Sequence, residues 1–124
     1  MNTSAQGLLL LAHGSRDPLW RQPFESMAQT IASRHTGPVV LAFLEFMQPT
    51  LNEGLHLLTQ QGASQLSVCP LFLAAGHHLR HDVPALVQQW QTTHPQMSVT
   101  LREPLGCDAT MQAAIADWAL RSTV

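Results

Sequence analysis

Short apolar runs alternate with amphipathic segments along the whole chain. Four short, mainly apolar runs are typical of strands in a parallel sheet that is covered on both faces. The strands predicted from them are residues 7–12, 39–44, 66–69 (continuing towards Leu73) and 97–101. After each run, apolar residues recur at the helical spacing i, i+3, i+4, i+7. The four stripes are Phe24, Met27, Ala28 and Ile31; Leu51, Gly54, Leu55 and Leu58; Val83, Leu86, Val87 and Trp90; and Met111, Ala114, Ile115 and Trp118.

Turn-forming residues separate these segments. Gly37-Pro38, Gly62 and His94-Pro95 each follow a predicted helix, and Asp17-Pro18 suits the start of the first one. Four strands that alternate with four helices predict βαβ units with right-handed crossovers. We therefore expect a single α/β domain over residues 1–124. Its fold is predicted to be a three-layer sandwich with a four-stranded parallel sheet in the flavodoxin-like order 2-1-3-4.

Polar residues follow the carboxyl ends of the first three predicted strands. These are His13, Glu45 and the histidine-rich stretch 77–81, which holds three histidines in five positions. Ligands of open parallel sheets bind outside the carboxyl ends of the strands. With the first strand between the second and third, and neighbours about 4.8 Å apart, these side chains are expected to converge. We expect residues 77–81 to form a loop and the next helix to open at Asp82-Val83-Pro84.

The composition excludes several classes of protein. The chain is 45% apolar and 11% charged, with six arginines and no lysine, which disfavours a binder of nucleic acid or of a membrane surface. Cys69 and Cys107 form neither a disulfide framework nor a zinc signature. The stretch 1–7 has no basic segment, and the run 7–12 is too short to span a bilayer. We expect a cytoplasmic protein.

The residues at the predicted sheet edge suit a divalent metal ion. Two imidazoles and a carboxylate are typical ligands of Co²⁺, Fe²⁺, Ni²⁺ or Zn²⁺. Glu45 could bind the ion or accept a proton, or it could be a strand-end residue that faces water. Asp82 could orient a histidine, or it could be only a helix N-cap. Arg16 and Arg80 flank the expected site and could pair with ligand carboxylates, and Ser15 could donate to a ligand or cap a helix.

The motifs together resemble the small sirohydrochlorin chelatases of the CbiX type, which belong to the class II chelatases and are related to sirohydrochlorin ferrochelatase. The matching stretches are residues 10–18 (LLAHGSRDP), residues 42–46 (AFLEF) with Pro49, and residues 70–73 (PLFL) with Gly76, His78, Asp82 and Pro84. The resemblance implies one half of the two-lobed chelatase fold and a homodimer that builds the cleft. It also implies that His13 and His78 bind the metal, because the family pattern Gly-x-His-x-x-x-Asp places its histidine at His78.

The resemblance implies insertion of a divalent metal into sirohydrochlorin without ATP or an organic cofactor, in cobalamin or siroheme biosynthesis. The metal is a substrate; Co²⁺ is the first expectation, with Fe²⁺ and Ni²⁺ as alternatives. We assign catalysis to His13, His78 and Glu45. Contacts with the tetrapyrrole are assigned to Ser15, Arg16, Gly76, His77 and Arg80. A non-catalytic carrier of metal or tetrapyrrole is the alternative, because it would use the same histidines.

Overall fold

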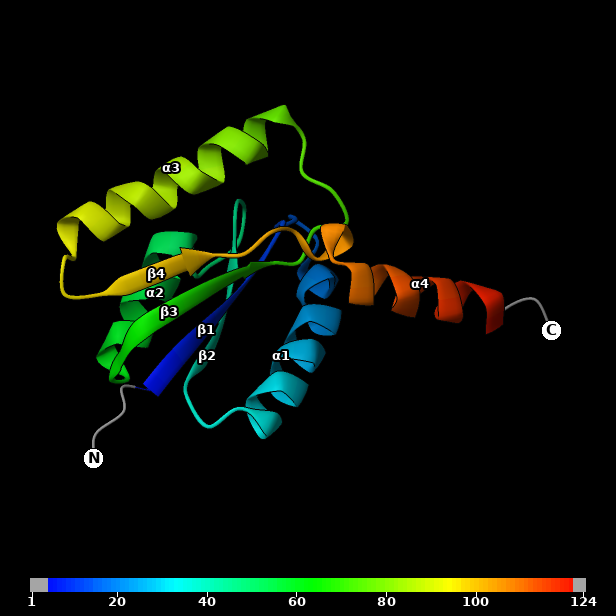
Figure 1. Ribbon diagram of the computed structural model, residues 1–124, viewed down its shortest axis with the longest axis horizontal. Helices are drawn as coiled ribbons and strands as arrows, with labels where there is room; N and C mark the ends of the chain where they lie inside the picture. Colours follow the sequence, from blue (N-terminus) through cyan, green and yellow to red (C-terminus); the bar gives the residue numbers. More distant parts are fainter. Residues whose placement is uncertain (1–4, 122–124) are drawn as a thin grey trace.

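The computed structural model describes residues 5–121, and all four predicted strands and four predicted helices are present (Figure 1). In chain order the elements are β1 (Ala5–Ala12), the 3-10 helix η1 (Pro18–Arg21), α1 (Gln22–Arg34), β2 (Val39–Phe43), α2 (Leu51–Gln60), β3 (Ala63–Pro70), α3 (His77–Thr93), β4 (Ser98–Leu101), the 3-10 helix η2 (Leu105–Cys107) and α4 (Ala109–Arg121). No helix within the described range is both long and apolar enough to cross a membrane.

The strands form one parallel sheet in the order β2-β1-β3-β4, which confirms the predicted topology. At the carboxyl end of β1, Leu11 is in register with Ala42 of β2 and with Pro70 of β3. The chain segments that leave β1, β2 and β3 therefore start at the same edge of the sheet. This register places His13 and Glu45 at that edge, and the segment 71–76 leads from the same edge to α3, as expected from the order of the strands.

The hydrophobic core lies on one face of the sheet, under α2 and α3. Leu9 and Leu11 of β1 are fully buried there, together with the apolar stripes that were predicted for these two helices. Alternation along the strand sends Leu8 and Leu10 to the opposite face, where α1 lies. Figure 1 shows α3 and α1 on opposite sides of the sheet. The arrangement is the predicted three-layer sandwich.

Local sequence signals explain where α1 and α2 begin. The Asp17 carboxylate accepts a hydrogen bond from the Leu19 N–H at 2.9 Å and caps η1, which leads directly into α1. Thr50 and Glu53 form a reciprocal capping box at the start of α2. These caps fix the direction in which the chain leaves the carboxyl edge after β1 and β2.

Two expectations were wrong. The stretch 77–81 is the first turn and a half of α3 rather than a loop, so the N-cap is Gly76 and Asp82 lies inside the helix. The apolar stripe of α4 was expected to pack like the other three. Instead, the helix projects from the edge of the molecule (Figure 1), and no residue of α4 is buried, which is also true of α1.

Candidate functional site

His13 directly follows β1 and is held by contacts on two sides. Its backbone carbonyl accepts a hydrogen bond from the indole N–H of Trp20 at 2.7 Å. Its ring packs against Phe72, with the ring centroids 4.6 Å apart. Phe72 comes from the segment between β3 and α3. The imidazole is thus positioned by η1 and by the segment that leads to the other histidines, while it remains exposed to solvent.

Glu45 lies beside His13. The distance from His13 Nδ1 to Glu45 Oε1 is 3.4 Å, and both side chains are about half exposed. The carboxylate faces an imidazole as well as water, so the geometry is compatible with both roles considered for Glu45. A carboxylate on one ring nitrogen favours the tautomer that leaves the other nitrogen free to bind a metal ion.

Gly14 allows the loops after β1 and β2 to approach this closely. A side chain at position 14 would place its Cβ 1.6 Å from the backbone oxygen of Glu45. The loop after β2 is also constrained at Phe46, which has a left-handed backbone with φ of 67°. The guanidinium of Arg16 lies 4.8 Å from the centre of the Phe46 ring. Arg16 therefore joins the two loops at the rim of the site through a cation–π contact.

The other histidines lie on the first turns of α3. The rings of His77 and His81, one helical turn apart, have centroids 4.5 Å apart, and the rings of His77 and His78 are 6.0 Å apart. All three residues are exposed. The segment that leads to His78 leaves β3 at the same edge of the sheet as His13, because β1 and β3 are parallel neighbours. Across residues 5–121, no three His, Cys, Asp or Glu side chains lie close enough together to hold a metal ion.

The other residues predicted to contact the tetrapyrrole differ in their surroundings. Ser15 Oγ accepts a hydrogen bond from the Asp17 N–H at 3.0 Å, so its hydroxyl supports the turn before η1 while its own proton stays available to a ligand. Gly76 is exposed and has open space around its Cα. Arg80 lines a cavity of about 340 Å³ between the start of α3 and the segment after β4.

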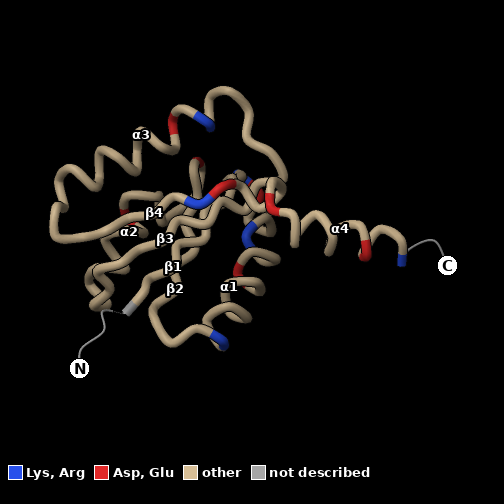
Figure 2. Tube along the Cα trace, viewed as in Figure 1, with Lys and Arg blue, Asp and Glu red and all other residues tan. Residues whose placement is uncertain are grey.

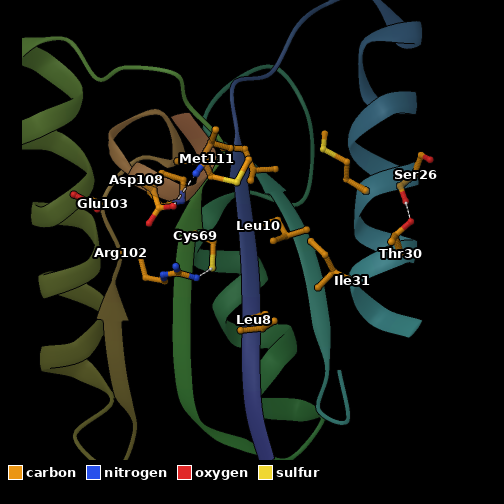
Figure 3. A pocket seen from close by; sticks show the side chains of 14 residues that line it. Leu8, Leu10, Ser26, Thr30, Ile31, Cys69, Arg102, Glu103, Asp108 and Met111 are labelled. Carbon is orange, nitrogen blue, oxygen red and sulfur yellow. Dashed lines mark hydrogen bonds between the residues drawn. The ribbon is translucent and has the colours of Figure 1, made fainter. Parts of the chain in front are cut away.

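Two features were not singled out from the sequence. The first is the Trp20 and Phe72 pair that positions His13; the PLFL motif contained Phe72, but nothing in it indicated which ring would meet the histidine. The second is an open groove of about 610 Å³ on the α1 face of the sheet (Figure 3). Cys69 lines this groove, and burial raises the pKa of its thiol, an effect that the nearby Arg102 guanidinium partly offsets.

Comparison with known proteins gives consistent matches. A sequence model of the family described as CbiX matches residues 7–121. The sirohydrochlorin cobaltochelatase of Saccharolobus islandicus (strain L.S.2.15 / Lassen #1) is 35% identical over 108 residues, which are 82% of this chain and 84% of that protein. The sirohydrochlorin ferrochelatase of Bacillus subtilis (strain 168) is 28% identical over 111 residues, which are 89% of this chain and 42% of that protein.

Solved structures give the same result. A CbiX protein from Marinobacter aquaeolei VT8 matches with a TM-score of 0.83 and 35% identity, over 94% of this chain and 96% of that one. The sirohydrochlorin chelatase SirB from Bacillus subtilis subspecies spizizenii, in complex with cobalt, matches with a TM-score of 0.74 and 28% identity. That match covers 84% of this chain and 45% of the SirB chain.

Proposed function

Because the chain belongs to the CbiX family, we propose that it is a chelatase that inserts a divalent metal ion into sirohydrochlorin. The observation that carries the proposal is the position of His13 beside Glu45 at the sheet edge from which the chain runs to His78 in the first turn of α3. Matches to proteins named as sirohydrochlorin cobaltochelatase and ferrochelatase support the same activity. We take Co²⁺ as the first candidate metal, with Fe²⁺ and Ni²⁺ as alternatives.

The proposed mechanism requires the ion to lose water and the macrocycle to lose two pyrrole protons. His13 and His78 bind the ion through neutral imidazole nitrogens and leave most of its coordination positions open. The pyrrole nitrogens can then displace water from these positions. Glu45, which lies 3.4 Å from His13, accepts one of the two protons, and the other passes to solvent water. The same weak coordination lets the metallated product leave.

The carboxylates of sirohydrochlorin need cationic or N–H partners. We assign this role to Arg16 and Arg80, to the Ser15 hydroxyl and to the first turn of α3, where Gly76 and His77 lie. Gly76 caps α3 without a side-chain hydrogen bond, and the first helical bond runs from the Arg80 N–H to the Gly76 carbonyl. The N–H groups that precede Arg80 in the helix therefore have no helical acceptor and point towards a bound anion.

We further propose that the protein acts as a homodimer in the cytoplasm. The chain covers 45% of the SirB chain, so two copies supply about the length of one such chain. Each copy would then contribute one wall of the cleft. Cys69 and Cys107 are both free thiols, as is usual in a reducing compartment.

The test is cobalt insertion under multiple-turnover conditions. Sirohydrochlorin and Co²⁺ are mixed with a substoichiometric amount of protein, without ATP or another cofactor, and the visible spectrum is followed. We expect many equivalents of product per protein, and a loss of at least about 10-fold in rate for His13→Ala and for His78→Ala. His56→Ala is the matched control, because His56 is exposed on α2, outside the proposed site.

The outcomes separate an enzyme from a carrier. A spectral change that stops at one equivalent of tetrapyrrole per protein would identify a binding protein rather than a chelatase. If both His13→Ala and His78→Ala still show multiple turnover, the chelatase activity stands but the proposed site is refuted. Replacing Co²⁺ by Fe²⁺ or Ni²⁺ in the same assay, with the ions in competition, ranks the metals.

A further inference from the structure

Helix α4 stands in solvent although one of its sides is apolar. Of its stripe, Met111 is 38% exposed, Ile115 39% and Trp118 66%. Over its whole length α4 carries only two charged residues, Asp117 and Arg121 (Figure 2). A helix of this composition is stable when its apolar side is covered, because packing supplies most of the stability of a short helix. An exposed apolar stripe of this kind marks an interaction surface.

The α1 face of the sheet has a complementary opening. The groove of about 610 Å³ lies between α1 and the strands, and its apolar lining includes Leu8 and Leu10 of β1 and Met27 and Ile31 of α1 (Figure 3). α2 and α3 both cover the other face, whereas α1 is the helix that covers this one. In a three-layer α/β domain, a second helix is expected beside α1.

The dimensions of α4 suit this opening. Its 13 residues span about 20 Å at 1.5 Å per residue. The eight residues of β1 span about 26 Å at 3.3 Å per residue. One α4 helix can therefore cover most of the length of the central strands.

The connection before α4 leaves Met111 at the groove of its own chain and turns the rest of the helix away from it (Figure 1). The Gly106 N–H donates to the Phe72 carbonyl at 3.0 Å, and Gln112 Nε2 donates to the Gly106 carbonyl at 2.9 Å. The Asp108 carboxylate caps the helix by accepting from the Met111 N–H at 3.0 Å. A Cβ on Gly106 would lie 1.7 Å from the Leu73 carbonyl oxygen, so the turn is also close-packed. The Gln112 bond to Gly106 spans the turn, so it would have to break before α4 could fold back.

We propose that two copies of this chain exchange their α4 helices, so that Ile115 and Trp118 of each copy fill the groove of the other. The proposal rests on the homodimer of the proposed function and specifies how that dimer is built. A two-fold exchange buries the same surface twice and closes without leaving a free stripe or groove. The exchange is also connected to the candidate site, because η2 is hydrogen-bonded to Phe72 and the Phe72 ring packs against His13.

Disulfide trapping tests the exchange directly. Cys69 lines the groove, so a cysteine on the stripe of α4 is paired with it in a Cys107→Ser background. Ile115→Cys and Trp118→Cys sample the stripe, and Ala116→Cys on the opposite side of α4 is the matched control. Oxidation is carried out above pH 8.5, because burial raises the pKa of Cys69. We expect covalent dimers on a non-reducing gel for at least one stripe variant and not for Ala116→Cys.

Two outcomes overturn the exchange of helices. An intramolecular disulfide, detected as a monomer that has lost both thiols, would mean that α4 covers its own groove. Dimers in light scattering without any Cys69 cross-link would mean that the copies meet through another surface, and would leave the homodimer and its activity intact. Failure of metal insertion with successful cross-linking would refute the proposed function alone.

A charged substitution gives an independent readout. Trp118→Asp is expected to raise the dimer dissociation constant at least about 30-fold, since a buried tryptophan is a typical binding hot spot. The substitution touches an exposed residue of the separate chain, so the helical circular dichroism of the monomer should persist. Ala116→Asp is the control and should leave the dissociation constant unchanged. Equal dissociation constants for Trp118→Asp and the parent would overturn the exchange.

Discussion

Replacing Gly14 by alanine tests how the site is assembled. A Cβ at position 14 would lie 1.6 Å from the Glu45 oxygen, and real Cβ atoms essentially never come closer than 3.0 Å. The neighbouring atom belongs to the backbone, so no side chain can rotate away. The backbone next to it is fixed as well, because the Leu44 N–H donates to the Ala12 carbonyl at 2.9 Å. The loop after β2 must therefore withdraw by more than 1 Å.

This displacement separates Glu45 from His13, whose nearest side-chain atoms are 3.4 Å apart. A misplacement of about 1 Å in a catalytic arrangement can cost about 100-fold in rate. Overpacking of this kind also costs about 2 kcal/mol of folding free energy, which corresponds to a melting temperature about 8 °C lower. The expected result is a folded protein with cobalt insertion about 100-fold slower than that of the parent.

The assay combines initial rates of cobalt insertion with thermal unfolding. Gly76→Ala is the control for stability: a Cβ there has no neighbour within 4 Å, and φ of −71° suits any residue, so its melting temperature should match the parent. Glu45→Gln retains the backbone and removes the carboxylate, so it separates loss of the charge from movement of the loop. A Gly14→Ala protein with the rate and melting temperature of the parent would refute the close approach of the two loops.

Three further predictions concern pH and the support of His13. Burial raises the pKa of Cys69, so the thiol of the unfolded chain loses its proton first, and the free energy of unfolding should fall above about pH 8.5. Urea unfolding should show a smaller fall for Cys69→Ala than for the parent. Identical pH profiles of the two proteins would contradict this prediction. Trp20→Phe removes the N–H that bonds to the His13 carbonyl and retains a ring near Phe24. Metal insertion should slow several-fold, and the free energy of unfolding should fall by about 1 kcal/mol. An unchanged rate would show that this bond does not position His13. Imidazole binds metal only when neutral, so insertion should decline in acid. Full activity well into the acid range would exclude histidine ligands.

The order of the strands and their shared edge were predictable because their signals are local. Continuous apolar runs identify buried parallel strands, and helical stripes between them require crossovers of one hand. From there, the position of His13 and Glu45 at one edge follows from counting residues to the strand ends. The 3.4 Å contact between these two side chains could not be predicted, because it depends on the close approach at Gly14 and the left-handed backbone at Phe46.

The start of α3 was mispredicted for a physical reason. Asp82-Val83-Pro84 has the residues of a helix entry, since Asp is a good N-cap and Pro fits the first turn. The helix begins at His77 instead, and Pro84 lies inside it, where it has no N–H to donate to the carbonyl four residues earlier. Packing of Val83, Val87 and Trp90 into the core outweighs that loss, and the added turn puts His78 at the N-terminal end of the helix.

The mispredicted position of α4 has a different cause. An apolar stripe requires that a helix side be covered, but it carries no information on which chain supplies the cover. Here the bonds at Gly106, Asp108 and Gln112 set the direction of α4, and they link it to Phe72. Phe72 in turn supports the His13 ring. A partner that fixes α4 therefore also fixes the segment between the two proposed metal ligands, so assembly of the dimer and alignment of His13 with His78 are parts of one structural requirement.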